Sequence, residues 1–586
     1  MPGVVKVFTA ADVPGERGTG LNFPDLPIFV AQGETTCCLG DFLAMVVADT
    51  AFHARQAAGK VDVDYEVLEP VTDPVAALEP DAPQVHPAGN MFVASNLLDT
   101  TAFTRGDVDA ALARSAHVIE ATFATQAVEP AFLEPEACLA LPQGNGVKVH
   151  TDSQGSIFDQ KQIAKVLNLP LEDVEIALAA SGGAFGAKEE LSIQAQTALA
   201  AHLLGWPVKT VLTREQSTQH HVKRHPMTLQ YTVGADAEGH LIAVRVRIIG
   251  DAGGYAGTSG KCLLRAACHS CGPYRVPHKS AKYAGIGCGI KSTGIGNGTI
   301  DSGHIVIRVI EGGRLEILNG YTELGQGVYT ATMQAVCEET GLPADIMTVR
   351  WDKDLGNKCG ETWASRATTL SCAAAQEAAQ KLARDLEDRR LTDLVGRTYE
   401  GDCVCNFTTR PGTPEAVENP TTHLTFSYST QVVILGEDGR LERVVAAHDV
   451  GRAINPRLCA EQMEGGVHMG LGYALSEEFT STNGKPDSLA LRDLGIVRAR
   501  DMPPCDVILI EVPDEVGGYG AKGVGEIGCV STAGAVAGAL HAYDGIRRFT
   551  LPMADSPAAV PLLPESRRRP AAADRQRRSA TRGFLS

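Results

Sequence analysis

Short apolar runs and amphipathic stretches follow one another along most of this chain. Runs rich in β-branched residues predict strands at 4–8, 43–48, 61–65, 148–151, 174–178 and 431–435. Apolar positions with helical spacing predict helices at 51–58, 159–167, 191–204 and, with many alanines, 373–386. We expect Asp159 to cap the second of these helices. Strands and helices mixed in this way, in two lobes, indicate an α+β fold.

Four stretches stand out by their glycine content, at 181–189, 321–327, 464–472 and 520–528. Glycine costs stability in regular structure, so these stretches predict a backbone that lies against something that leaves no room for Cβ atoms. The object we expect is a ligand. In the last stretch a single carboxylate, Glu526, lies between Val524 and Ile527. Burial there would raise its pKa towards neutrality and make it a usable base, whereas the alternative is a turn with a solvated glutamate.

None of these stretches is a nucleotide-binding loop. Lys188 is preceded by Ala187 and followed by Glu189, whereas a P-loop requires Gly-Lys followed by Ser or Thr. The Gly-x-Gly run at 285–287 lacks the strand, the spacing and the later acidic residue of a dinucleotide fingerprint.

Metal ligation by side chains is also poorly supported, since the chain has no His-Glu-x-x-His motif. The nearest candidate is the Cys-His-Ser-Cys run at 268–271, with Cys262 and Cys288 nearby. Its spacing departs from the ferredoxin pattern, so ordinary buried thiols are the preferred interpretation.

Composition limits the class of protein further. The 586 residues are 44% hydrophobic, which is enough for a large buried core and several domains. A net charge of −18 argues against nucleic acid as a partner, because phosphate binding needs a basic face. The chain has no apolar run long enough for a membrane span and starts without a signal peptide, so we expect a cytoplasmic location. The 15 cysteines then indicate thiols in a reducing compartment, without disulfides.

Three glycine-rich motifs together resemble a known family. They are Gly-Gly-Ala-Phe-Gly-Ala-Lys-Glu at 182–189, Leu-Gly-Gln-Gly at 324–327 and Gly-Ala-Lys-Gly-Val-Gly-Glu at 520–526. In this order they resemble the molybdenum-cofactor subunit of the xanthine dehydrogenase and aldehyde oxidase family, over residues 1–553. The runs at 289–298 and 364–368 are similar to the branch of selenium-dependent xanthine dehydrogenases.

The resemblance implies a partial α/β hammerhead domain followed by a two-lobed molybdopterin-binding domain. We place the hammerhead domain at 1–85, a linker at 86–102, and the two molybdopterin-binding domains at 103–278 and 279–553. Residues 554–586, rich in proline, alanine and arginine, predict a disordered basic tail. A long family segment is missing between His278 and Lys279, and with it a Phe-Arg-Gly-Phe-Gly loop that lines the substrate site of relatives.

The resemblance also assigns the site residues. Glu526 matches the catalytic base, and Glu189 and Arg265 match two positions that bind a purine. No side chain is expected to ligate molybdenum, which the pterin holds. The positions that match the cofactor environment are Gln154, Phe185, Gly186, Gln326, Thr362, Trp363, Ala364, Ser365, Gln462, Lys522 and Gly523. Structural alternatives exist: Gln326 could only cap a turn, and Arg265 could lie on a helix surface.

The implied reaction is oxidative hydroxylation of a purine-like heteroaromatic, of xanthine or hypoxanthine type, with water as the oxygen donor. Glu526 would take a proton from the attacking hydroxyl while a hydride moves to a sulfido or selenido ligand. The cofactor is molybdopterin, with a cytosine dinucleotide form allowed.

Electrons would pass to partner subunits that carry iron–sulfur clusters and FAD, in a dimer of heteromers, because the sequence contains neither kind of site. The alternatives are the large subunit of an aldehyde or carbon monoxide dehydrogenase and a non-catalytic remnant that lacks the substrate loop.

Overall fold

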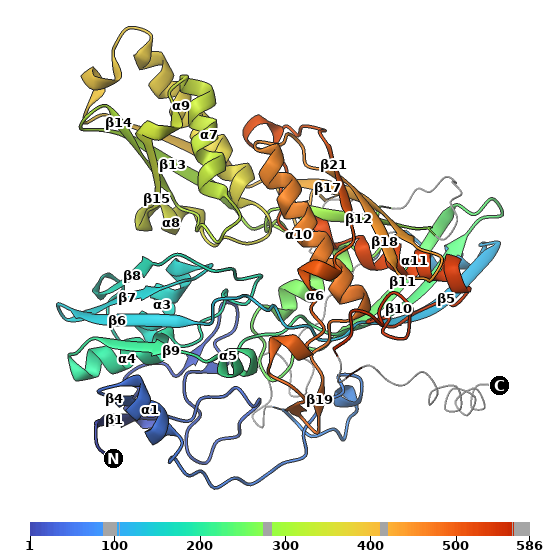
Figure 1. The fold of residues 1–586 in the computed structure, drawn as a ribbon, viewed down its shortest axis with the longest axis horizontal. Helices are drawn as coiled ribbons and strands as arrows, with labels where there is room; N and C mark the ends of the chain where they lie inside the picture. Colours follow the sequence, from blue (N-terminus) through green and yellow to red (C-terminus); the bar gives the residue numbers. More distant parts are fainter. Residues whose placement is uncertain are drawn as a thin grey trace.

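The computed structural model describes residues 1–85, 102, 104, 106–273, 284–410, 420–564 and 567. Within these ranges, sheets of three and four strands carry helices on their faces (Figure 1), which confirms the α+β class. Of the predicted linker at 86–102, only residue 102 belongs to the described residues. The join at 278–279 lies outside them.

The N-terminal unit contains two strand pairs and one helix. Its elements are β1 (Val4–Phe8), β2 (Gly18–Thr19), β3 (Leu26–Pro27), β4 (Met45–Ala48) and α1 (Ala51–Ala58). β1 pairs antiparallel with β4, and the hydroxyl of Thr50 caps α1 by accepting a hydrogen bond from His53 N. Phe8 and Phe29 are fully buried in a core shared with the first sheet of the next unit.

The strand predicted at 61–65 is wrong. The structure places this stretch outside any strand, with the side chains of Val61, Val63 and Tyr65 exposed. Alternation of apolar residues favours a strand, but a strand also needs a neighbour to accept its hydrogen bonds, and the described chain offers none here.

The first large sheet has the strand order β8-β7-β6-β9. Its elements are β6 (Ala137–Gln143), β7 (Gly146–Thr151), α3 (Ser156–Leu167), β8 (Val174–Leu178), α4 (Gln194–Leu204), β9 (Val208–Val211) and α5 (Arg214–His220). β7 and β8 run parallel, and α3 connects them. α3 begins at Ser156, three residues before the predicted helix, and its cap residue is Gly155. Asp159 is therefore not the predicted cap but a buried residue of the helix interior, where burial raises its pKa to about 7.

A three-stranded sheet, β11-β10-β5, completes this half of the chain. Its elements are α2 (Val108–Ala113), β5 (His117–Ala124), β10 (Met227–Ala235), β11 (Leu241–Gly250) and α6 (Ser259–Cys268). α6 packs against β11 and ends next to the undescribed residues 274–283.

The second half contains two four-stranded sheets. The first, β15-β14-β13-β16, consists of β13 (Asp301–Ile310), β14 (Arg314–Asn319), β15 (Met347–Trp351) and β16 (Thr398–Cys405), with α7 (Val328–Thr340), α8 (Lys353–Cys359) and α9 (Ala367–Leu386). α9 extends the predicted alanine-rich helix by six residues at its start. Its small buried side chains let the helix pack closely on β13 and β16.

The other sheet, β12-β17-β18-β21, lies at the right of Figure 1. It consists of β12 (Ala284–Thr293), β17 (Thr425–Leu435), β18 (Leu441–Asp449) and β21 (Cys505–Ile510), covered by α10 (Pro456–Leu475) and α11 (Thr532–Asp544). A small pair, β19 (Ser481–Thr482) and β20 (Lys485–Pro486), follows α10. Gly287 is required in β12 because a Cβ atom there would overlap the carbonyl oxygen of Ser531, just before α11.

The predicted tail is partly wrong. Residues 554–564 pack on the core of the β12-β17-β18-β21 sheet, where Ala558 and Ala559 are buried, and Arg567 donates to the carbonyl of Glu478. Burial of the apolar residues in this stretch keeps it ordered, although its proline and alanine content had predicted disorder. The remainder of 554–586 lies outside the described residues.

Two further properties concern the whole described chain. None of the fifteen cysteines, all of which lie in the described part of the chain, forms a disulfide. Among the described residues, no helix has the length and apolar character needed to cross a membrane.

Candidate active site

The carboxylate of Glu526 lies where three segments distant in sequence meet. Its Oε2 atom is 2.9 Å from Nζ of Lys291, in β12, and accepts a 2.6 Å hydrogen bond from Oγ of Ser365. Gln462, in α10, donates to the carbonyl of Gly525 at 3.1 Å and so holds the loop that carries the glutamate.

These neighbours reverse the expected direction of the Glu526 pKa. Burial alone would raise the pKa of this carboxyl. The ammonium of Lys291, the hydroxyl of Ser365 and the guanidinium of Arg265 outweigh burial and lower the pKa to about 2. The expectation of a near-neutral pKa is therefore wrong, because the opposite charge of Lys291, in contact with the carboxylate, favours its ionised form.

The glycines of the 520–528 stretch make room for protein backbone. A Cβ atom on Gly523 would overlap the carbonyl oxygen of Ser365, and one on Gly525 would lie 3.2 Å from Oγ of the same serine. Gly528 packs on Gly466 of α10, where an added Cβ would lie 2.9 Å from the neighbour's Cα. A ligand is thus not what requires these glycines: the loop packs directly on the segment 362–365 and on α10.

The segment 362–365 has a strained backbone. Ala364 and Ser365 have φ angles of +57° and +52°, in the left-handed region that residues other than glycine seldom adopt. Thr362 N donates to the carbonyl of Gln154 at 2.9 Å, and Oγ1 of Thr362 accepts from Thr322 N at 2.8 Å. The surrounding contacts fix the bend that directs the Ser365 hydroxyl to the carboxylate.

We expect Gly523→Ala to lower the stability of the chain by about 1–3 kcal/mol, the usual cost of overpacking, because the new methyl group would displace the 362–365 segment. The measurement is the melting temperature. Gly465→Ala is the matched control, since a Cβ at Gly465 meets nothing within 4 Å. The control should be neutral or slightly stabilising, because alanine is the better helix former in α10. Equal melting temperatures for the two variants would contradict the packing argument.

Glu189 and Arg265 lie in the same electrostatic neighbourhood as Glu526. Burial, followed by the negative charge of Glu526, raises the pKa of Glu189 to about 8, so Glu189 is protonated at neutral pH. Arg265, in α6, directs its guanidinium at the carbonyls of Gly294 and Ile295, at 3.4 and 3.3 Å. It is half-buried and not free on the helix surface. The structure thus brings together the three residues that the sequence assigns to base and substrate.

Gln154 connects two parts of the predicted cofactor environment, residues 185–186 and the segment 362–365. Its Oε1 accepts a 3.1 Å hydrogen bond from Gly186 N, and its Nε2 donates to the carbonyl of Thr362 at 3.3 Å. Phe185, next to Gly186, has a φ of +54° and a 62% exposed side chain. These predicted cofactor residues therefore adjoin one another across the first and second halves of the chain.

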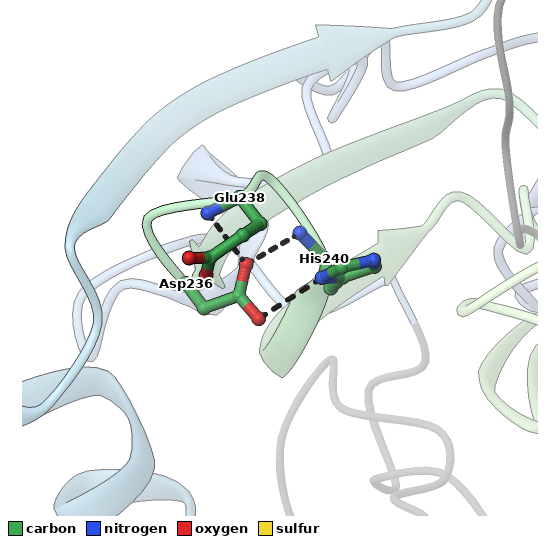
Figure 2. Close-up of side chains that lie close together, drawn as sticks. All are labelled: Asp236, Glu238 and His240. Atoms are coloured by element: carbon green, nitrogen blue, oxygen red, sulfur yellow. Dashed lines mark hydrogen bonds and ion pairs between the residues drawn. The ribbon is translucent and has the colours of Figure 1, made fainter.

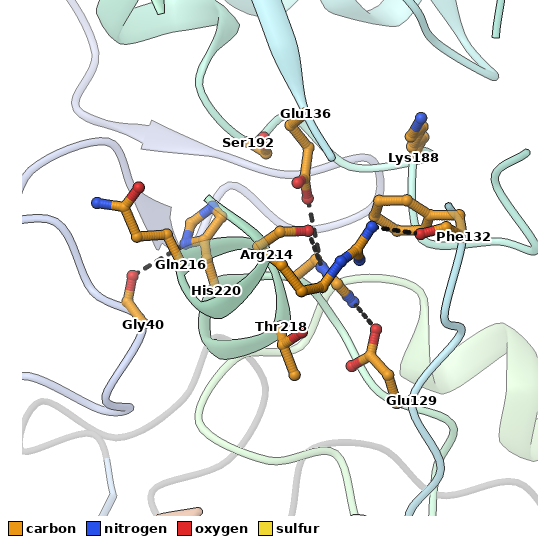
Figure 3. Close-up of polar contacts among 12 residues, drawn as sticks. Gly40, Glu129, Phe132, Glu136, Lys188, Ser192, Arg214, Gln216, Thr218 and His220 are labelled. Carbon is orange, nitrogen blue, oxygen red and sulfur yellow. Dashed lines mark hydrogen bonds and ion pairs between the residues drawn. The ribbon is translucent and has the colours of Figure 1, made fainter. Parts of the chain in front are cut away.

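Polar and charged side chains around α5 lie near Lys188, the residue before Glu189 (Figure 3). Lys188 forms an ion pair with Asp152 and lies 4.6 Å above the ring of Phe132. Arg214, at the start of α5, donates to the carbonyl of Phe132 at 2.7 Å. The buried side chain of His221 pairs with Glu129 and Glu136. Because Lys188 and Asp152 are paired and buried, they fix the backbone next to Glu189.

Two predicted cofactor residues use their polar groups within the protein. Gln326 accepts from Leu324 N at 2.5 Å and donates to the carbonyl of Thr322 at 2.9 Å, which is the turn-capping arrangement. Lys522 forms a 2.7 Å ion pair with Asp449, and both side chains are buried. A role for either residue towards a cofactor stays a prediction.

Trp363, Lys261 and Glu361 form a polar patch beside the strained segment. The indole Nε1 of Trp363 and Oε1 of Glu361 are buried and have no hydrogen-bond partner within the described ranges. Nζ of Lys261 lies 5.0 Å above the Trp363 ring. Unpartnered polar atoms of this kind suit a ligand that supplies the missing hydrogen bonds.

Sequence reasoning missed several titratable residues that lie near Glu526 or near its charged neighbours Lys291 and Arg265. Lys291 is the most important, and its sequence signal is a lone lysine within a glycine-rich strand. The rings of His269 and His423 lie 5.5 Å apart. Burial, with the charge of Arg265, lowers the pKa of His269 to about 4 and that of His423 to about 3, so both imidazoles are neutral. Nothing in the sequence pairs these two residues.

A cluster with metal-ligand chemistry occurs elsewhere, in the turn between β10 and β11 (Figure 2). Asp236 accepts hydrogen bonds from the backbone N–H groups of Glu238 and His240, at 3.1 and 2.8 Å, and from the His240 ring at 3.1 Å. Glu238 and His240 are exposed. The contacts are those of a turn, so the arrangement needs no metal.

Two cavities of about 510 Å³ lie away from this site. One lies between the edge strands β8 and β15 and is lined by Glu175, Leu178, Arg350 and Trp351. The other lies along α3, next to Gly15. Neither includes a predicted site residue, so the candidate site is defined by its converging loops and not by these cavities.

Three family models match this chain. Two family models described as molybdopterin cofactor-binding domains match residues 89–294 and 274–503. A third, the a/b hammerhead domain of aldehyde oxidase and xanthine dehydrogenase, matches residues 1–69.

Similar proteins include a probable xanthine dehydrogenase subunit of Bacillus subtilis, 27% identical, with 92% of this chain and 88% of the relative covered. The nicotinate dehydrogenase large molybdopterin subunit of Eubacterium barkeri is 35% identical, over 47% of this chain and 63% of the relative. The chain spans 20% of xanthine dehydrogenase 1 of Arabidopsis thaliana, at 32% identity. The first alignment runs over 674 positions, more than the 586 residues of this chain, so that relative contains residues without a counterpart here.

Solved structures show the same fold. The aldehyde oxidoreductase of Desulfovibrio gigas superimposes with a TM-score of 0.78, at 20% identity over 96% of this chain and 74% of the other. A Cu,Mo carbon monoxide dehydrogenase gives a TM-score of 0.76 at 18% identity, over 96% and 91%. At such identities the likeness establishes the architecture and not the reaction.

Proposed function

Because the chain is a molybdenum-cofactor-binding subunit of the xanthine dehydrogenase and aldehyde oxidase family, we propose that it forms the hydroxylating site of a molybdenum hydroxylase for an electron-poor heteroaromatic ring. The observation that carries this proposal is the ionised carboxylate of Glu526, held in one neighbourhood with Glu189 and Arg265.

The residues present fit a molybdopterin. The unpartnered Nε1 of Trp363 offers a donor, and the left-handed conformations of Phe185 and Ala364 suit backbone N–H groups that face a polar ring edge. When bound, the cofactor supplies a metal centre that transfers water-derived oxygen to the substrate and takes up two electrons. The residues that we propose to hold it are Gln154, Phe185, Gly186, Gln326, Thr362, Trp363, Ala364, Ser365, Gln462, Lys522 and Gly523.

The chain's own residues divide the remaining work. Glu526 is the general base, and its low pKa keeps it ionised at any physiological pH. Glu189, protonated at neutral pH, donates a hydrogen bond to a ring nitrogen or carbonyl. Arg265 stabilises negative charge that develops on a substrate oxygen. Donors at two ends of the substrate suit a purine-like ring of xanthine or hypoxanthine type.

The large subunit of an aldehyde or carbon monoxide dehydrogenase is the second candidate, supported by the fold shared with both kinds of enzyme. An aldehyde requires less polar recognition than the Glu189 and Arg265 pair provides, so we rank it second. The Eubacterium barkeri relative, whose name specifies nicotinate, adds support for a heteroaromatic substrate.

We further propose partner subunits with iron–sulfur clusters and FAD as the electron acceptors, since the sequence has neither the ferredoxin cysteine pattern nor a flavin segment. A sulfido or selenido ligand and the cytosine dinucleotide form of the pterin belong to the same proposal.

The test is production of the chain in a host that makes molybdopterin, followed by measurement of molybdenum and selenium and by turnover assays with an artificial electron acceptor. We expect stoichiometric molybdenum and faster turnover of hypoxanthine and xanthine than of aliphatic or aromatic aldehydes. Faster turnover of aldehydes would favour the second candidate. A folded chain that binds no molybdenum would identify a non-catalytic remnant.

The Glu189 pKa predicts an alkaline limit to activity. Above about pH 8 this residue loses the proton that it donates, and its new charge repels electron-rich substrate atoms as well as Glu526. Activity, measured as kcat/KM, should therefore fall as pH rises through this value, although Lys261 partly offsets the repulsion from Glu190 and Glu361.

Glu189→Gln should remove this alkaline limit, because the amide keeps a donor at every pH. Glu190→Gln is the comparison variant. Glu190 accepts a hydrogen bond from Leu21 N outside the substrate contacts, so loss of its charge should shift the limit to lower pH without removing it. The same alkaline limit in Glu189→Gln would show that another group causes it.

A further inference from the structure

The two oxygens of the Glu526 carboxylate are not equivalent. Oε2 receives both polar contacts of this side chain, from Nζ of Lys291 at 2.9 Å and from Oγ of Ser365 at 2.6 Å. Within the described chain, no hydrogen bond or ion pair reaches Oε1. The side chain is 50% exposed, so Oε1 is the oxygen open to an incoming molecule.

Both groups that hold Oε2 are themselves fixed. Lys291 lies within β12, opposite Ser427 of β17, and its ammonium also donates to the carbonyl of Ser292 at 2.8 Å. Its side chain is only 10% exposed, so the ammonium has little freedom to move away. Ser365 is fixed by its left-handed backbone and by the close packing of Gly523 against its carbonyl.

We propose that Lys291 and Ser365 are positioning residues that bind Oε2 of Glu526 and thereby make Oε1 the atom that accepts the proton in the reaction. This inference rests on the proposed function for its catalytic part and on the geometry alone for its structural part. Other charged or titratable groups near Glu526 come from neighbouring elements: Arg265 of α6, Glu189 of the 181–189 stretch and Cys529, whose thiol donates to the Glu526 carbonyl at 3.3 Å.

The proton balance is simple. An O–H bond of the attacking group breaks, an O–H bond to Oε1 forms, and no electrons pass through the carboxylate. Because Oε2 keeps its two donors throughout, the carboxyl does not rotate when it takes the proton. Protonation weakens the ion pair with Lys291, which favours return of the proton to solvent from the exposed Oε1 after the reaction.

The structural part is tested without turnover, by isotope-edited infrared titration of the full chain labelled with ¹³C-glutamate. The Glu526 band is identified by its loss in Glu526→Gln. Lys291→Met should raise the titration midpoint of Glu526 by about 1–3 units, the usual effect of an opposite charge in contact. Ser365→Ala should raise the midpoint by less. Lys291→Arg keeps a cation beside Oε2, so its midpoint should stay close to that of the unaltered chain.

Lys261→Met is the matched control for this titration. It removes a neighbouring cation that lies over Trp363 and makes no contact with Glu526 within the described chain, so the midpoint should stay unchanged. An unchanged midpoint in Lys291→Met would overturn the structural part. If that variant fails to fold, Ser365→Ala still decides, because an unchanged midpoint in Ser365→Ala would overturn the structural part as well.

The catalytic part is tested with molybdenum-loaded protein at a pH where Glu526 is ionised in every variant. Lys291→Met should then still lose about 10²-fold in kcat, because a misplaced base is inefficient even when it is ionised. Full kcat in this variant would overturn the proposal that positioning matters. If the unaltered chain loads molybdenum but does not turn over any substrate, the proposed function fails, while the infrared midpoints still decide the structural part.

Discussion

Glu526→Gln is expected to lose turnover by about 10²–10⁴-fold, which corresponds to a barrier higher by about 3–5 kcal/mol. The amide keeps the shape of the side chain and an oxygen that can accept from Ser365, but it has no basic oxygen for a proton. Molybdenum content should stay equal to that of the unaltered chain, because Glu526 is not among the proposed cofactor contacts. The measurement is kcat at matched molybdenum content.

Glu461→Gln is the matched control for this variant. Glu461 lies in α10, is 52% exposed like Glu526, and forms an ion pair with Arg457 at 2.8 Å. Its substitution should leave kcat unchanged, because it lies outside the site. If Glu526→Gln keeps more than about a tenth of the rate, the loss is too small for removal of a general base, and the solvated turn carboxylate becomes the better interpretation.

Arg366→Met is expected to cause the largest loss of stability, about 3–5 kcal/mol, because it leaves a buried carboxylate without its partner. Arg366 is 1% exposed and Asp301 is fully buried, and their ion pair measures 2.8 Å. The guanidinium also donates to the carbonyls of Cys359 and Glu361 at 3.1 and 2.9 Å. Asp301 in turn accepts from the backbone of residues 295 and 296.

The variant should therefore loosen the backbone at residues 295–296 and 359–361. The measurement is the midpoint of urea unfolding of the full chain, monitored by tryptophan fluorescence. Two of the three tryptophans, Trp351 and Trp363, lie near this region. Arg457→Met is the control, because its ion pair is exposed and worth at most about 1 kcal/mol. Equal midpoints for the two variants would show that the buried pair is not what holds these segments. Molybdenum content should fall with Arg366→Met and not with the control.

The sequence predicted helices and strands correctly where the periodicity of apolar residues agrees with the packing in the folded chain. The strand at 4–8, the helix at 51–58 and the strand at 174–178 occur with the predicted bounds. The stretch at 61–65 has the same kind of pattern but is not a strand, because pairing depends on a partner from elsewhere in the chain. The prediction of a disordered tail was wrong at its start for a related reason: composition does not reveal that Ala558 and Ala559 fill a space beside α11.

The sequence by itself predicted, through motifs that resemble a known family, that Glu526, Glu189 and Arg265 belong to one site. The structure places the three residues in one electrostatic neighbourhood. Only the tertiary structure decided the charge state of Glu526. Apolar neighbours in sequence predict a raised pKa, whereas Lys291 and Ser365, far away along the chain, lower it to about 2. The reason for the glycines also became clear only from the tertiary structure, because Gly523 packs on Ser365 and not on a ligand. Electrostatic and steric effects depend on distances between atoms, and those distances exist only once the chain has folded.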